Sequence, residues 1–121
     1  MNESQTIAIQ TEFDVFMARM QVRKLAREMG FNITNQARIA LATSSLARAL
    51  KLGENLQGQM IINYLGEEKC TGVQVICTAI DGAGQEIGPR GFAEVEWLVD
   101  ELSVEQLPSN DLQVTLVKWI A

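Results

Sequence analysis

The hydrophobic positions of this chain follow a period of two in some stretches and a helical period in others. Alternation with a period of two is typical of half-buried strands, and apolar residues three and four apart are typical of amphipathic helices. The pattern predicts the order strand, helix, helix, strand, strand, helix, strand. The corresponding residues are 6–10, 12–29, 35–52, 59–65, 73–80, 92–102 and 112–119.

The first predicted helix has clear signals at both ends. Thr11 is a favourable N-cap residue, and the acidic Asp14 three positions later completes a capping box. Gly30 ends the helix, as glycine commonly does at helix C-termini. Its apolar residues form a stripe that continues around the helix, and we interpret the methionines among them as core filling. The stripe consists of Phe13, Phe16, Met17, Met20, Val22, Leu25, Ala26 and Met29.

The second predicted helix carries very little charge. It extends from Asn35 to about Leu52, after a cap at Asn32–Thr34. A helix that is apolar or small on several faces packs on more than one side. We therefore expect it to lie against the sheet with Ile39 and Leu46 buried. Its charged residues are Arg38, Arg48 and Lys51.

The order of the elements and the length of the chain indicate a single domain over residues 1–121. With 121 residues, of which 47% are hydrophobic, the chain can build one core and is too short for two. Gly66–Lys69 has the length of a hairpin turn, which predicts antiparallel pairing of the flanking strands. Several helices on one face of a mostly antiparallel sheet form a two-layer α+β sandwich, which is the predicted fold class.

The charge of the chain excludes some classes of partner. The net charge of −5 argues against nucleic acid as a partner. Arg19, Arg23 and Arg27 share one helix face, which we interpret as a solvated face. No apolar run approaches the roughly 18 residues of a membrane span, and the N-terminal residues lack the pattern of a signal peptide. We therefore expect no membrane association and a cytoplasmic location.

The sequence also lacks several kinds of reactive side chain. The absence of histidine excludes histidine-based acid–base catalysis and histidine-containing metal sites. Cys70 and Cys77 are seven positions apart in what looks like one strand, so they do not form a Cys-x-x-Cys pair. We interpret them as small, buried or half-buried hydrophobic residues in a reducing compartment. No metal site is predicted.

Several short sequences, taken with the order of the elements, resemble the GHKL superfamily of histidine-kinase-like and HSP90-like ATPases. They are Ala26–Phe31 (AREMGF), Gln36–Ala40 (QARIA), Leu46–Arg48 (LAR), the Asp81–Gly82 loop after the hairpin, and the closing Val117–Trp119 (VKW). Within this superfamily the chain is most similar to the RsbT/RsbW-like branch of bacterial serine kinases and anti-sigma factors. The resemblance extends over about residues 5 to 120. It implies a Bergerat-like fold, in agreement with the predicted α+β sandwich.

The family's catalytic helix is the place where this chain departs from the pattern. In the family a Glu activates the attacking hydroxyl, and an Asn four residues later ligates the magnesium ion of ATP. Ser45 and Ala49 occupy these two positions here. Ala49 has no ligand atom for the metal, and Ser45 alone is no base near neutral pH, which forfeits the roughly 10²–10⁴-fold of general base catalysis. We therefore predict no catalytic residue and no ATPase or kinase activity.

Two further family elements concern the nucleotide. The resemblance places Asp81 where the family recognises adenine, but the glycines after it stand one position early, and Asp-Gly is also an ordinary turn. The family's glycine-rich ATP lid is reduced to Gly88–Gly91. Without the lid and the metal ligand, an acidic chain has little to offset the charge of ATP. We therefore expect no cofactor, with ATP and magnesium as the weak alternative.

These observations leave two functional hypotheses. In the first, the chain is a non-catalytic regulatory module that has lost its ATP site and acts in partner switching. By resemblance, its partner is a sigma factor, a phosphatase or a STAS-domain protein. In the second, the chain is an ATP-binding serine/threonine-kinase-like switch with a rearranged pocket around Asp81, Ser45 and Arg48.

Two features bear on association with other proteins. The strand Thr6–Gln10 is expected at a sheet edge, where its unpaired backbone groups could pair with a second copy or a partner, so a homodimer is possible. Trp97 in the last predicted helix is interpreted as a core residue, with an interface anchor as the alternative.

Overall fold

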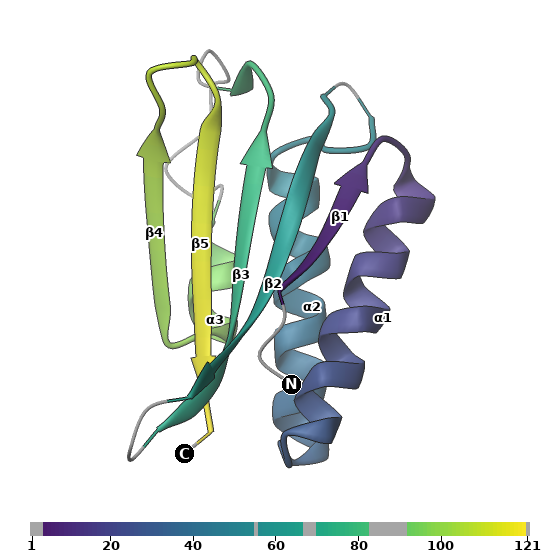
Figure 1. Ribbon diagram of the computed structural model, residues 1–121, viewed down its shortest axis with the longest axis vertical. Helices are drawn as coiled ribbons and strands as arrows, with labels where there is room; N and C mark the ends of the chain where they lie inside the picture. Colours follow the sequence, from purple (N-terminus) through teal and green to yellow (C-terminus); the bar gives the residue numbers. More distant parts are fainter. Residues whose placement is uncertain (1–3, 55, 67–69, 83–91, 121) are drawn as a thin grey trace.

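A computed structural model of the chain describes residues 4–54, 56–66, 70–82 and 92–120. Its strands and helices (Figure 1) follow one another in nearly the predicted order, with one additional strand before the last. The elements are β1 (Gln5–Ile9), α1 (Glu12–Glu28), α2 (Ile33–Ala49), β2 (Gly58–Gly66), β3 (Thr71–Ala79), α3 (Ala93–Leu98), β4 (Glu101–Gln106) and β5 (Leu112–Trp119).

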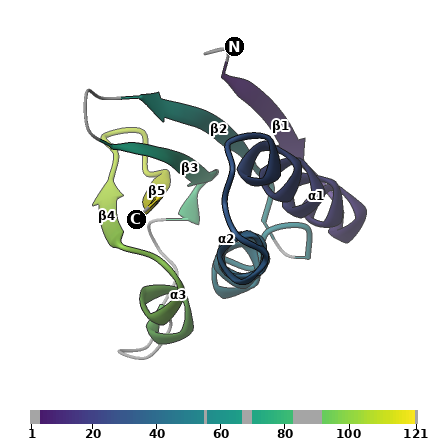
Figure 2. The ribbon, with the colours of Figure 1, turned by 90° about the horizontal axis from the view of Figure 1, so that it is seen from below.

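The strands form one antiparallel sheet in the order β1-β2-β3-β5-β4. The predicted hairpin is present, because β2 and β3 pair from Gly58 opposite Ala79 to Gly66 opposite Thr71. All three helices lie on the same face of the sheet (Figure 2). The predicted α+β sandwich is therefore confirmed. β1 lies at the edge of the sheet, as expected from its place near the start of the chain.

α2 occupies the centre of the helical layer, between α1 and α3 and against the sheet (Figure 2). Ile39 and Leu46 are fully buried, which confirms the prediction for this helix. The small residues of α2 allow its neighbours to approach closely, because an alanine or serine keeps the helix surface narrow. The other buried residues of α2 are Gln36, Ala40, Ala42, Thr43, Ser44, Ser45 and Ala47.

Both long helices begin and end with the expected local chemistry. In α1 the Thr11 hydroxyl accepts from the backbone N–H of Asp14, and the Asp14 carboxylate accepts from the backbone N–H of Thr11, which is a complete capping box. Gly30 follows α1 with a φ of 91°, a conformation that suits glycine. In α2 the Asn32 side chain accepts from the backbone N–H of Asn35 at 2.8 Å.

The interpretation of the methionines of α1 as core filling is wrong for Met20, which is exposed. α1 buries the small residues Ala18, Val22 and Ala26 against the rest of the fold. α1 lies at the side of the helical layer (Figure 2), and several of its large side chains are exposed. The exposed fractions are 66% for Phe13, 53% for Phe16 and 50% for Met20.

The last helix is shorter than predicted and is followed by a strand that the sequence analysis missed. The helical spacing of apolar residues predicted a helix over 92–102, but α3 ends at Leu98, where Val99 takes an extended conformation. β4 then pairs with β5 from Glu101 to Gln106. Only Leu102 in β4 is even half-buried, so this edge strand has no apolar alternation by which to recognise it.

Trp97 and Cys70 are both exposed, in contrast to what their residue types predicted. Trp97 is 86% exposed, so its interpretation as a core residue is wrong; the short α3 buries only Val95. The expectation of two buried or half-buried cysteines holds only for Cys77, since Cys70 lies before β3 and is exposed. Burial raises the pKa of the Cys77 thiol to about 12, so this thiol is protonated and unreactive at neutral pH.

Candidate functional site

Ser45, at the position that the resemblance assigns to the catalytic Glu, is an unusual residue in the structure. Its side chain is 6% exposed, and within the described ranges its Oγ is a buried polar atom without a hydrogen-bond partner. The neighbouring hydroxyls are paired, because Thr43 donates to the carbonyl of Ile39 at 2.8 Å and Ser44 to that of Leu41 at 3.1 Å. A buried hydroxyl without a partner costs about 1–3 kcal/mol. A ligand group that reached Ser45 Oγ would recover this cost.

Ala49 follows Ser45 by one helical turn and is half-buried. Its methyl group offers no metal ligand. Among the residues that the structure describes, no group of three or more Asp, Glu or Cys side chains is placed to hold a metal ion.

Asp81 lies at the turn that follows β3 and is exposed. Its φ of 56° is in the left-handed region, and its backbone N–H donates to the carboxylate of Asp111 at 2.9 Å. The following Gly82 is required by packing, because a Cβ there would lie 2.7 Å from the Cβ of Ala79. The Asp-Gly pair thus has a local structural reason as a turn. The Asp81 carboxylate has no hydrogen-bond or ion-pair partner in the described part of the chain, so it is available to a ligand.

The sequence-predicted residues Ser45 and Asp81 lie toward the same end of the molecule. The C-terminal ends of α2 and β3 are both at the upper end of the view in Figure 1. A hydrogen bond of 2.9 Å from the Ile80 N–H to the Gln57 carbonyl ties the end of β3 to the segment after α2. The predicted remnant of the ATP lid, Gly88–Gly91, lies outside the described residues.

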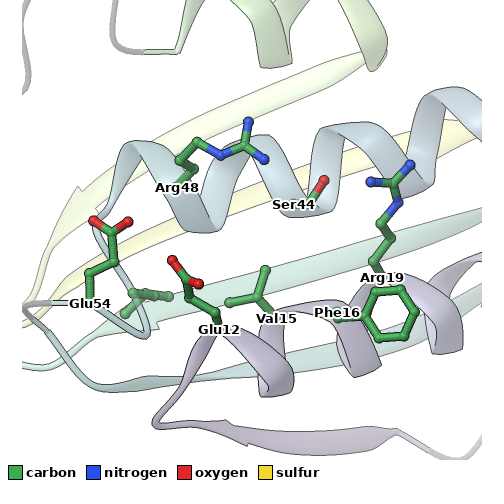
Figure 3. A pocket seen from close by; sticks show the side chains of 8 residues that line it. Glu12, Val15, Phe16, Arg19, Ser44, Arg48 and Glu54 are labelled. Carbon is green, nitrogen blue, oxygen red and sulfur yellow. The ribbon is translucent and has the colours of Figure 1, made fainter.

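A groove between α1 and α2 is a concave site that was not predicted from the sequence. It encloses about 280 Å³. Glu12 and Glu54 lie at one end, while Arg19 and Arg48 stand on either side of Ser44 (Figure 3). The available signal was the spacing of Ser44 and Arg48, which places both side chains on one face of α2. The groove is lined by Glu12, Val15, Phe16, Arg19, Ser44, Arg48, Leu52 and Glu54.

The structure does not bring Arg48 together with Ser45 and Asp81. Arg48 lines the groove on the α1 side of α2, as Ser44 does (Figure 3), and neither Ser45 nor Asp81 lines it. One residue along a helix rotates a side chain by about 100°, so Ser45 points away from this groove. The hypothesis of a rearranged pocket grouped Arg48 with Ser45 and Asp81. In the structure Arg48 lies on a different surface, the groove between α1 and α2.

The comparison with known proteins supports the resemblance. No protein-family model matches the chain. The chain is 29% identical to the serine/threonine-protein kinase RsbT of Bacillus subtilis (strain 168), over an alignment of 133 residues that covers 99% of both chains. This is a distant relationship to the RsbT/RsbW-like branch of the GHKL superfamily, and it extends over the whole fold.

The comparison corrects the prediction that the chain is not an enzyme. The relative that matches it from end to end is a serine/threonine-protein kinase, which points to an enzymatic family. The prediction relied on Ser45, Ala49 and the shortened lid, and these departures from the family pattern do not establish that activity is lost. In the described part of the chain, no helix is long and apolar enough to cross a membrane.

Proposed function

We propose that this chain is a serine/threonine-kinase-like switch protein that binds an adenine nucleotide and acts through a protein partner. The observation that carries the proposal is the similarity to a serine/threonine-protein kinase over 99% of both chains. A similarity of that extent includes the helix, the turn and the sheet that surround the family's nucleotide site. In this proposal the nucleotide state is the input of the switch, and binding or phosphorylation of a cytoplasmic partner protein is its output.

Ser45 and Asp81 are the residues that support a nucleotide at the end of α2 and β3. The exposed Asp81 carboxylate can accept a hydrogen bond from an adenine amino group. Ser45 Oγ has no partner within the described residues, but it is shielded from solvent, so a ligand would meet it only after a neighbouring group moved. Since Ala49 supplies no metal ligand, the proposal assigns no magnesium contact to α2.

Thermal unfolding with and without nucleotide tests the binding step. At about 100 times its dissociation constant, a ligand that binds only the folded state adds roughly 2.7 kcal/mol of stability. We expect ATP to raise the melting temperature of the native chain. Asp81→Gly should remove this effect and keep the turn, because glycine accepts the φ of 56° at this position. Arg48→Ala, in the separate groove, is the matched control and should respond to ATP as the native chain does.

A phosphotransfer assay tests the output of the switch. The chain would be incubated with ATP labelled at the γ-phosphate and with a purified STAS-domain protein from the same cell. We expect label on a serine or threonine of that protein and a complex of the two proteins in gel filtration. Absence of both label and complex, together with an unchanged melting temperature in ATP, would contradict the proposed function.

A further inference from the structure

α1 carries a row of large, exposed apolar side chains that nothing in the described part of the chain covers; one of them, Phe16, also lines the groove toward α2. Phe13, Phe16 and Met20 are each at least half exposed. Their spacing of three and four residues places them on one face of the helix. The rings of Phe13 and Phe16 lie 6.5 Å apart between centroids. These three residues, the α1 stripe, make a contiguous apolar surface of the kind that marks protein interaction sites.

Charged residues of opposite sign flank the α1 stripe along the same side of the helix. Glu12 lies near its N-terminal end, and Arg19 and Arg23 lie toward its C-terminal end. All three side chains are exposed. None has an ion-pair partner within the described residues, where the ion pair present joins Lys118 to Asp100. The α1 surface is therefore acidic at one end, apolar in the middle and basic at the other.

We propose that two copies of this chain associate through antiparallel pairing of their α1 helices. With the twofold axis beside Phe16, Phe13 of one copy lies opposite Met20 of the other, since these residues lie three before and four after Phe16. Glu12 then lies opposite the stretch between Arg19 and Arg23 of the second copy. The pairing covers the α1 stripe and brings opposite charges together at both ends.

A second copy fits this surface because the surface is complementary to itself. A twofold axis places the same patch on both partners, so each charge contact occurs twice. A parallel arrangement would instead place like charges opposite one another, which is unfavourable. The inference rests on the proposed function only in that both assign a protein partner to this chain. It names helix α1 as the surface, in place of the β1 edge suggested by the sequence.

Sedimentation velocity over a range of protein concentrations tests the association. We expect the mass of the native chain to rise from 13.4 kDa toward twice that value as the concentration increases. Phe16→Ser should weaken the dimer by about tenfold or more, because a central aromatic residue is a typical interface hot spot. Trp97→Ser is the matched control, since Trp97 is also exposed but lies on α3, on the far side of α2 (Figure 2). Circular dichroism checks that both variants are folded.

Charge reversal tests the antiparallel register. Glu12→Arg alone should weaken the dimer, as should Arg19→Glu combined with Arg23→Glu, because each variant places like charges opposite one another in its own dimer. A mixture of the two variants should associate, since both charge contacts of the mixed dimer are again between opposite charges. Added salt should weaken this mixed dimer.

The outcomes separate this inference from the proposed function. A native chain that stays monomeric at all concentrations overturns the inference. So does a dimer that Phe16→Ser leaves intact, or one that Trp97→Ser disrupts equally. The ATP-dependent change in melting temperature should be the same in Phe16→Ser as in the native chain. Loss of that response with the dimer intact would instead count against the proposed nucleotide site.

Discussion

Helices α1 and α2 have the same length and lie side by side, yet most side chains of α1 are accessible to solvent and about half of those of α2 are buried. Each contains 17 residues, but α2 buries nine of them and α1 only three. α2 has α1 on one side, α3 on the other and the sheet beneath it (Figure 2). α1 has α2 on one side and the sheet beneath it, but no described helix on its other side. α2 has neighbours on more sides and also carries fewer charged residues than α1, and both differences favour its burial.

The residue types of the two helices make this contrast informative. α1 carries exposed phenylalanine and methionine side chains, whereas α2 consists largely of alanine and other small residues on its buried faces. A crowded position favours small side chains because they let neighbouring elements approach closely. Large apolar side chains on a peripheral helix therefore indicate a surface for another molecule more readily than a core.

The largest expected difference between the two helices is in the free energy of unfolding when one large side chain of each is replaced by alanine. Leu46→Ala in α2 removes a fully buried side chain and should lower the free energy of unfolding by about 2–5 kcal/mol. Met20→Ala in α1 removes a side chain that is 50% exposed and should change it by no more than about 0.5 kcal/mol in the monomer. Urea unfolding at a concentration where the chain is monomeric measures both. Similar losses for the two variants would remove the distinction between the helices.

A smaller effect is expected at the two adjacent serines of α2. Ser45→Ala removes a buried hydroxyl without a partner in the described part of the chain and should raise the free energy of unfolding by about 1 kcal/mol. Ser44→Ala is the control, because its hydroxyl donates to Leu41 within the helix and its loss should give no such gain. Both are measured by urea unfolding without nucleotide. A destabilised Ser45→Ala would mean that the hydroxyl has a partner in the folded chain.

The smallest effect concerns the caps of the two helices. The backbone N–H groups of Gln10 and Thr11 lower the pKa of Asp14 below 3.8, so its carboxylate stabilises the start of α1 above that pH. This contribution is lost as the pH falls through the lowered pKa of the folded state. Asp14→Asn should therefore be less stable than the native chain at neutral pH, and the difference should shrink in acid.

The cap of α2 provides the control for this pH dependence. Asn32 caps α2 with a neutral amide, which does not titrate. Asn32→Ala should lose about 1 kcal/mol at neutral pH and a similar amount in acid. Unfolding free energies of the three proteins over the acidic range measure the effect. A difference between Asp14→Asn and the native chain that stays constant with pH would contradict the role of the carboxylate.

The accuracy of the sequence analysis followed the strength of the local signals. Thr11 with Asp14, and Gly30, fixed the ends of α1, and the low charge of α2 predicted its central place, because caps and periodicity are properties of consecutive residues. β4 was missed because its pairing energy comes from β5 and its side chains are mostly exposed. Trp97 was misplaced because its size indicates burial only where a neighbouring element covers it.

The candidate site, too, was predicted from the sequence only in part. The sequence pointed to Ser45, Ala49 and Asp81 only through its resemblance to the GHKL family, whose short motifs are read along a helix and a turn. Only the tertiary structure decided that Ser45 Oγ is buried without a partner among the described residues, that Arg48 faces a separate groove, and that the α1 stripe is exposed. These are properties of distances between segments far apart in the chain. A sequence fixes which face of a helix is apolar, but the packing of its neighbours decides which face meets the solvent.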